Sequence, residues 1–455
     1  MIRKIFIAAA TVALLAGTAL AAVTPEEAKQ LGTTLTETGA EKAGNKEGTI
    51  PPYTSGLTTP PPGFNKDKGI RPDPFANEKR LYSIDAKNMD KYADQLTEAT
   101  KALMKKYPTY RVDVYQTHRT AAYPKYVIEN TKKNATRAKT LNGGLEVTGA
   151  YGGVPFPIPK TGYEVMWNHL LRFTGYSVSF DRSNWNVDSA GHRTLASRSI
   201  MYEEYPYYNP AKTLETNDSD LYYMIKILFT GPPRQVGGAL LIKDSVNPLK
   251  TGRKAWQYLV GQRRVKLAPE LAYDTPSSTA AGMYTYDDSY VFNGGMDRYD
   301  VKLVGKKEMI VPYNNYKHFN ETDIAKKLGP HHVNPDYMRW ELHRVWVVEA
   351  KLKPGKRHIY LRRVFYVDED GWGALASDQY DANGNLYRSA LALGSPNYDI
   401  PAPATNDVSV YYDLIANSYS AAGQPNEGGG GKRNFPGGLP TKEWTPENLA
   451  GSGIR

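Results

Sequence analysis

Apolar and polar residues alternate with a period of two over much of the chain after residue 175. Side chains of a strand point to opposite sides in turn, so this period predicts strands with one apolar face each. The alternating segments are 110–119, 176–187, 195–205, 221–229, 256–260, 265–267, 340–348, 359–367, 372–380, 386–393 and 408–415. Short turn-forming sequences such as Asp381-Ala-Asn-Gly-Asn385 separate them. We therefore expect about ten strands in an antiparallel meander.

A few stretches show apolar residues at three- and four-residue steps instead, which predicts helices at 86–106, 124–140, 162–173 and 322–328. So few helices cannot cover both faces of a large sheet. A sheet of about ten strands twists and tends to curl, which leaves a concave side that needs a cover. The predicted fold class is therefore α+β, mainly β. It is a large antiparallel curved sheet forming an incomplete β-barrel, with a few helices plugging its concave side.

The two ends of the chain differ from this body. Residues 1–22 combine a positive start, an apolar run and a small-residue cleavage site, which is the pattern of a signal peptide. Residues 23–80 are rich in proline and glycine and predict an extended arm, either a strap on the body or a partner-binding segment. The half-barrel domain is expected at 81–420, and residues 421–455 are expected to form a flexible tail.

Composition narrows the function classes. Cysteine is absent, which excludes disulfide scaffolds, thiolate metal sites, cysteine nucleophiles and a lipid-anchored N-terminal cysteine. Lys and Arg outnumber Asp and Glu by 57 to 47, but the excess is spread along the chain and predicts no nucleic-acid partner. No later stretch is apolar enough to cross a bilayer. We expect a soluble, exported protein, with no transmembrane segment after signal cleavage and no lipid anchor.

Motifs of common catalytic chemistry are missing from the sequence. It holds no Gly-x-Ser-x-Gly elbow, phosphate-binding loop, His-Glu-x-x-His pair or dinucleotide fingerprint. The acids Asp368-Glu369-Asp370 precede a glycine, which predicts a turn and not a metal or acid–base site. Adjacent His331 and His332 point apart in extended chain, so a shared metal ion is not expected. No catalytic residue, metal or cofactor is therefore assigned.

Two further polar groups receive structural interpretations. Glu341 and His343 lie on the polar parity of their strand, together with Arg339 and Glu349, which predicts a charge ladder on the surface. The pair Asp287-Asp288 lies in a tyrosine-rich stretch and is given no role.

Aromatic and apolar residues on the predicted inner parity are candidates for lining a ligand cavity. They are Trp256, Tyr258, Trp340, Leu342, Trp346 and Phe365. Ordinary core packing is the simpler explanation of their alternation. Arg344 and Arg363 share this apolar parity, where an arginine is costly unless it is paired. Each is therefore expected either to meet a ligand headgroup or to pair with an inward Asp or Glu.

Four stretches together resemble a known family. They are GAEKAGNKEGTI at 39–50, WQYLVGQRRVKLAP at 256–269, the long segment 343–372 and YDANGNLYR at 380–388. These stretches resemble the exported Gram-negative proteins grouped as domain of unknown function 1329, over about residues 24–420. That family is described as outer-membrane lipoprotein-sorting-like, by similarity to periplasmic lipoprotein carriers and their receptor.

The resemblance implies an incomplete β-barrel closed by helices around an acyl-binding cavity. It also implies a helper that moves hydrophobic molecules in the cell envelope. Possible partners are an inner-membrane transporter of the resistance–nodulation–division type and an outer-membrane channel protein. The lipoprotein receptor of the wider group carries a lipid on cysteine, and this chain has no cysteine to acylate.

Three functions follow as hypotheses. The first is a periplasmic carrier or binding protein for a lipid or other hydrophobic molecule. The second is a non-catalytic envelope scaffold, favoured by a solid core and an arm that does not grip its own body. The third is an envelope hydrolase or lyase, favoured if Glu341, His343 and Asp368 converge within about 4–6 Å with shifted pKa values.

Overall fold

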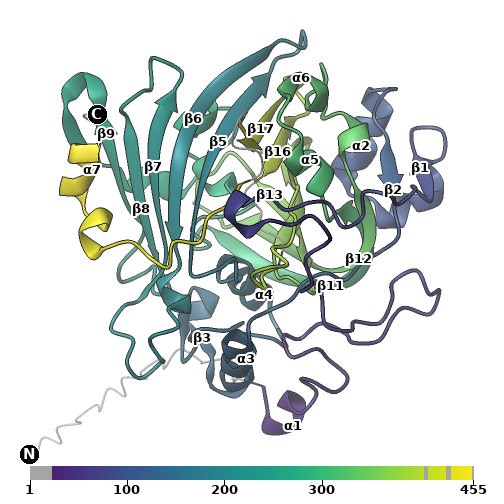
Figure 1. Ribbon diagram of the computed structural model, residues 1–455, viewed down its shortest axis with the longest axis horizontal. Coiled ribbons are helices and arrows are strands. Elements are labelled where there is room, and N and C mark those ends of the chain that lie inside the picture. Colours follow the sequence, from purple (N-terminus) through teal and green to yellow (C-terminus); the bar gives the residue numbers. More distant parts are fainter. Residues whose placement is uncertain (1–22, 404–407, 427–431, 453–455) are drawn as a thin grey trace, which may run out of the picture.

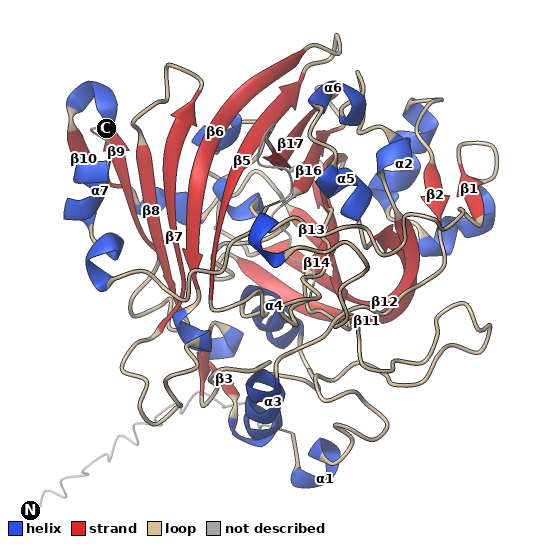
Figure 2. Ribbon diagram, viewed as in Figure 1, coloured by secondary structure: helices blue, strands red, loops and turns tan. Residues whose placement is uncertain are grey.

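The computed structural model describes residues 23–403, 408–426 and 432–452, so the expected signal peptide lies outside the described residues. Fifteen strands form one large curved sheet (Figures 1 and 2). Two antiparallel meanders, one after the other, build it. The first contains β5 (Ser177–Val187), β6 (Arg193–Glu204), β7 (Leu221–Gly231), β8 (Ala239–Ser245), β9 (Lys254–Leu259) and β10 (Arg264–Leu267). The second contains β12 (Trp340–Leu352), β13 (Arg362–Asp368), β14 (Ala374–Tyr380), β15 (Leu386–Ala392), β16 (Ser409–Asp413) and β17 (Ser418–Pro425).

The last strand of the second meander pairs with the first strand of the first meander, which joins the halves along β17 and β5. At the far end of the second half, β12 pairs with β11 (Tyr299–Pro312) and touches β2 (Val112–Val114), which pairs with β1 (Tyr82–Ile84). Within the described ranges, β10 and β11 do not pair with each other. The barrel is therefore open, and the expected fold class is confirmed.

The helices are short and lie around the sheet. They are α1 (Pro25–Ala28), α2 (Glu98–Lys106), α3 (Lys125–Arg137), α4 (Gly162–Leu170), α5 (Tyr316–Asn320), α6 (Ile324–Lys327) and α7 (Pro446–Ser452). A separate two-stranded sheet contains β3 (Lys139–Leu141) and β4 (Glu146–Thr148). No helix within the described ranges has the length and apolarity that a membrane span requires.

Both faces of the sheet are covered, which explains why β14 and β16 are buried along their whole length. Helix α4 contacts β11 and β12 and contributes Val165, Met166 and Trp167 to the inner core. Helix α2 contacts β15 on the opposite, outer face. Helix α7 packs on the outer face of β8 and β10 (Figure 1, left). Of these three helices, α4 is the one that plugs the concave side.

The inner face is filled mainly by an irregular stretch, residues 268–298, which we call the inner segment. It contains the short 3-10 turns η6 (Pro269–Ala272), η7 (Ser278–Ala280) and η8 (Tyr286–Asp288). Its Leu271, Tyr284 and Phe292 belong to the same hydrophobic cluster as the inner residues of β7 and β8. Chain without regular secondary structure therefore does much of the plugging that the sequence assigned to helices.

Several expected elements differ in extent. The helix expected at 86–106 is divided into the 3-10 helix η2 (Met89–Gln95) and α2, and the strand expected at 110–119 shrinks to Val112–Val114. Strands β8, β11 and β17 were not expected at all. The boundary expected at residue 420 falls inside β17, and part of the expected tail, Trp444 and Leu449, is buried against the outer face.

Candidate functional site

A cavity of about 80 Å³, the inner cavity, lies between the inner face of the first meander and the inner segment. Alternation along β7 and β8 aims every second side chain at it, because strand side chains change face at each residue. The strands contribute Phe180, Met201, Ile225, Ile227, Leu240 and Ile242, and the inner segment contributes Tyr284, Tyr286 and Tyr290. The walls are thus aliphatic on the sheet side and aromatic on the segment side.

The tyrosines hold the inner segment in place with polar and stacking contacts. Tyr284 stacks on Tyr411 of β16, with ring centroids 4.1 Å apart. The Tyr290 hydroxyl donates to Glu203 of β6. Burial raises the pKa of Tyr284 to about 12 and that of Tyr290 well above its usual value. These hydroxyls therefore stay protonated, and each bonds a neighbouring side chain, Tyr284 to Thr279 and Tyr290 to Glu203.

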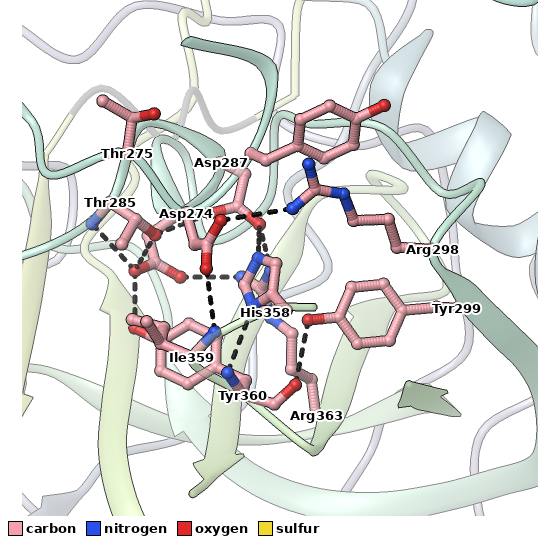
Figure 3. A network of polar contacts seen from close by, with 12 residues as sticks. Asp274, Thr275, Thr285, Asp287, Arg298, Tyr299, His358, Ile359, Tyr360 and Arg363 are labelled. Atoms are coloured by element: carbon pink, nitrogen blue, oxygen red, sulfur yellow. Dashed lines mark hydrogen bonds and ion pairs between the residues drawn. The ribbon is translucent and has the colours of Figure 1, made fainter. Parts of the chain in front are cut away.

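Arg363 anchors the inner segment to β13 (Figure 3). Its side chain is fully buried, and its two terminal nitrogens donate to Asp287 and Asp288, each over 2.7 Å. His358 lies 3.0 Å from Asp287, and the Tyr360 hydroxyl donates to Asp288 over 2.8 Å. Burial alone would raise the pKa of Asp287, but Arg363 and His358 outweigh it and hold that pKa below its usual range.

This arrangement assigns a role to the pair that the sequence left without one. Of the two partners expected for Arg363, a ligand headgroup or an inward acid, the structure shows the acids: Arg363 pairs with Asp287 and Asp288. Burying one arginine against two carboxylates is tolerated because each charge has a partner and further hydrogen bonds. Asp287 and Asp288 are therefore structural anchors of the inner segment.

Arg253, which follows β8 in the turn to β9, makes a second anchor. Its guanidinium grips Asp244 of β8 with two hydrogen bonds of 2.7 Å. The same side chain donates to the carbonyl oxygens of Leu271 and Asn293, both over 2.9 Å. Arg253 thus joins the sheet to two points of the inner segment.

A second cavity, the end cavity, has a volume of about 240 Å³ and lies on the other side of Arg253, which lines both spaces. Helix α4 contributes Trp167 and Leu170 to its wall, and β7 contributes Tyr222. The turn after β8 and the end of the inner segment complete the wall. This cavity is three times as large as the inner one, and its lining includes Asp244, Arg253 and Asp297.

A cluster of buried polar groups lies elsewhere, where β12 meets the turn between β13 and β14. Glu341 and His343 are 0% and 1% exposed, and their side chains are 3.0 Å apart. The carboxyls of Asp368 and Asp370 lie close to His343, with one ligand atom of each within 4.8 Å of the others. The expected surface charge ladder is therefore wrong, because the chain N-terminal to β1 and the loop after β2 cover this face.

The three acids 368–370 do form a turn, but a buried one. Asp370 is held by Arg119, whose Nε and one terminal nitrogen donate to its two carboxylate oxygens over 2.9 and 2.6 Å. Asp368 accepts from the Tyr313 hydroxyl over 2.9 Å and lacks a described cation of its own within ion-pair distance. Burial and the neighbouring Asp370 raise the pKa of Asp368 to about 7. The cluster therefore carries a proton near neutral pH.

His343, Asp368 and Asp370 are of the residue types that bind metal ions. Their polar atoms are already engaged, however. Asp370 is saturated by Arg119, Asp368 bonds Tyr313, and His343 bonds Glu341 while its ring stacks on Tyr313 at 3.7 Å. The side chains of this cluster therefore form a structural network in which they bond one another.

Residues 36–53, which we call the strap, cover this cluster. Trp372 donates to the carbonyl oxygen of Thr38 over 3.0 Å, and Arg344 donates to that of Ala43 over 2.9 Å. Lys306 bridges Glu41 and Glu369 at 2.9 and 2.8 Å. The expected arm thus grips its own body in this part.

The structure does not bring the eight sequence-selected ligand residues together. Trp256 and Tyr258 lie on the outer face beneath the C-terminal segment. Trp340 and Leu342 pack in the outer hydrophobic cluster, and Arg344 lies under the strap. Trp346 is half-buried beside Trp372, while Arg363 and Phe365 line a gap of only about 10 Å³.

The residues that line the inner cavity are not those that the sequence suggested as ligand-binding. Ile225 and Ile227 belong to a predicted strand, but Leu240 and Ile242 lie in the overlooked β8. Tyr284, Tyr286 and Tyr290 lie in the tyrosine-rich stretch around Asp287 and Asp288. Their spacing was the available signal, since three tyrosines in a loop of a globular protein need a surface to pack on.

Comparison with known proteins places the chain in a family. A sequence profile described as protein of unknown function (DUF1329) matches residues 83–450. An uncharacterized protein of Pseudomonas aeruginosa, PA3922, is 42% identical over 427 residues, which are 91% of this chain and 90% of that protein.

Solved structures similar to this chain share less of it. A DUF1329 family protein from Desulfovibrio piger is 16% identical, with a TM-score of 0.43, over 63% of this chain and 97% of that one. A putative outer membrane lipoprotein-sorting protein domain from Vibrio parahaemolyticus is 14% identical, also with a TM-score of 0.43, over 63% and 97%. The family expected from the sequence motifs is confirmed by the profile and the Pseudomonas relative: the chain belongs to the DUF1329 family.

Proposed function

We propose that this protein is a periplasmic carrier or binding protein for a lipid or another hydrophobic molecule, which binds on the inner face of the half-barrel. The single observation that supports this most is the inner cavity, walled by aliphatic side chains of β7 and β8 and by three tyrosines. Ligand pockets in proteins are typically concave and mostly apolar with a few polar groups, and this space fits that description.

The inner cavity is small, so a ligand longer than a few carbon atoms requires movement of its wall. At about 80 Å³ it is smaller than the roughly 150 Å³ hollow that accepts benzene in a protein core. A slender end of an acyl chain fits as the structure stands. A longer chain enters only when Tyr284, Tyr286 or Tyr290 turns aside, and these side chains come from chain without regular secondary structure.

The proposal has two further parts. The signal-like segment 1–22 directs export, and the protein delivers its hydrophobic ligand to a transporter or receives it from one. The partners would be an inner-membrane transporter of the resistance–nodulation–division type and an outer-membrane channel protein. Without a cysteine the chain has no site for an N-terminal lipid, so protein contacts would have to keep it near either membrane.

Native mass spectrometry followed by solvent extraction of gently purified protein tests the binding role. We expect a co-purified lipid or other apolar compound, and several-fold less of it in Leu240→Phe, which adds volume inside the inner cavity. The matched control is Leu228→Phe, which adds the same ring type on the outer face of neighbouring β7. Protein that is always empty, or equal loads in both variants, would contradict the proposal.

A second candidate is an envelope hydrolase, because Glu341 bonds His343, His343 lies close to Asp368, and the pKa of Asp368 rises to about 7. Against it, all three side chains are at most 3% exposed, and none lines the inner or the end cavity. A hydrolytic activity that His343→Gln abolishes without unfolding the protein would favour this candidate. The scaffold hypothesis is weakened by the strap, which grips its own body.

A further inference from the structure

The end cavity is separate from the inner cavity that carries the proposed function. Its volume of about 240 Å³ exceeds the roughly 150 Å³ that holds a benzene ring in a protein interior. It is therefore large enough for a small ring compound with a short side chain, with no movement of the inner segment.

One side of the end cavity is aromatic and aliphatic. Trp167 and Tyr222 meet edge to face, with ring centroids 6.2 Å apart, and Leu170 and Met296 extend the same wall. The indole nitrogen of Trp167 is already satisfied, since it donates to the carbonyl oxygen of Gly144 over 2.9 Å. This wall offers apolar contact and ring electrons.

The lining also carries three charged side chains, whose charges do not cancel. Asp244 and Arg253 neutralise each other through two hydrogen bonds of 2.7 Å. Asp297 remains, and its carboxylate accepts one hydrogen bond of 3.0 Å from the Tyr273 hydroxyl. Among the described residues it forms no ion pair within 4.0 Å. The lining therefore has a formal charge of −1.

The cations around the rim are engaged elsewhere. Arg298 lies on the face of Tyr273 at 3.5 Å and pairs with Asp274 at 3.3 Å. Lys353 donates to the backbone oxygen of Asp297 over 3.2 Å and not to its carboxylate. Asp297 thus lines a partly apolar space without an ion-pair partner among the described residues, a setting in which a carboxylate attracts a cation.

We propose that the end cavity is a binding site for a compact organic cation, an ammonium group on an aromatic or short alkyl body. The ammonium group pairs with Asp297, and the body packs on Trp167 and Tyr222, whose rings also attract a cation. Recognition combines one charge with one apolar wall, so an anion of the same shape is excluded. This site does not depend on whether the inner cavity holds a lipid.

Three probes of nearly equal size test the inference on the unaltered full chain: 3-phenylpropylammonium, 3-phenylpropan-1-ol and 3-phenylpropanoate. Isothermal titration calorimetry at pH 7 measures each affinity. We expect the ammonium compound to bind at least about tenfold more tightly than the alcohol, with the anion weakest. The opposite order, equal affinities or no binding of the ammonium compound would overturn the proposal.

Two variants locate the effect. Asp297→Asn keeps an acceptor for the Tyr273 hydroxyl but removes the charge, so the ammonium compound should fall to the affinity of the alcohol. Asp300→Asn is the matched control, since this aspartate is exposed on β11 and does not line the cavity. An unchanged preference in Asp297→Asn would overturn the proposal. A lipid found by extraction would leave this outcome unaffected, so the two proposals fail separately.

Discussion

The inner segment and the turn between β13 and β14 each bury a group of neighbouring acids, yet their surroundings differ. In the inner segment one arginine, Arg363, reaches both Asp287 and Asp288 at 2.7 Å. In the turn, Arg119 is taken up by Asp370, and Asp368 is left with neutral hydrogen-bond donors. The pKa of Asp287 is therefore lowered, while that of Asp368 rises to about 7.

The difference shows that a run of acids has no fixed behaviour. A carboxylate that loses water must find a positive charge or take up a proton, and the position of a single guanidinium decides which. One region therefore carries its charge as a permanent ion pair, and the other changes its charge within the physiological pH range.

The strongest way to break this contrast is to remove the shared cation. Arg363→Met leaves Asp287 and Asp288 buried without a guanidinium, and we expect a loss of about 3–5 kcal/mol in the free energy of unfolding. Urea denaturation at pH 7 measures it. Arg362→Met, on the half-exposed neighbouring position, should change stability by less than about 1 kcal/mol. Equal losses in both variants would mean that Arg363 does not anchor the segment.

The second test concerns the proton on Asp368. A carboxyl with a higher pKa in the folded than in the unfolded chain binds its proton more tightly when folded. Its contribution to stability is therefore complete below about pH 4 and is lost as the pH rises through about 7. Asp368→Asn should remove this slope and gain roughly 2–4 kcal/mol relative to the unaltered protein at pH 8. Thermal unfolding curves from pH 4.5 to 8 measure both.

The outcome that contradicts this second prediction is specific. If the stability difference between Asp368→Asn and the unaltered protein is the same at pH 5 and pH 8, Asp368 is ionised throughout. The turn would then resemble the inner segment, and a cation would have to be closer than Arg119.

The smallest expected effect concerns Arg344, which holds the strap over the acidic turn between β13 and β14. Arg344→Met removes the 2.9 Å hydrogen bond to Ala43, but Lys306 still neutralises Glu369, so we expect a loss of about 1–2 kcal/mol. Limited proteolysis should cut within residues 36–53 faster than in the unaltered chain. Lys351→Met, at the exposed end of β12, is the control and should leave the cleavage rate unchanged.

Alternation in the sequence predicted most of the strands, and the turn-forming sequences between them marked where each strand ends. The number of strands then predicted the open curved sheet. Alternation missed β8, whose Ala239-Leu-Leu-Ile242 run is apolar on both faces and is buried on both. It missed β11, where a register shift between Leu303 and Gly305 interrupts the period. A period of two cannot mark strands that lack it.

The candidate site was less predictable for a related reason. Trp256 and Leu241 share a face, but α7, about 190 residues later, covers that face as firmly as the inner segment covers the other. Parity shows that two side chains point the same way and does not show which way is inward. The partners of Arg363 were also invisible, because 75 residues separate it from Asp288.

The join between β17 and β5 has a consequence for how the chain reaches this structure. Tyr419 pairs with Val187 across more than half of the polypeptide, so β5 keeps an open edge until almost the whole molecule is available. Such distant pairing slows folding, and until it forms, the edge of β5 stays unpaired and prone to aggregation. A newly made copy would therefore gain from a chaperone that shields this exposed edge until the C-terminal strands have been made.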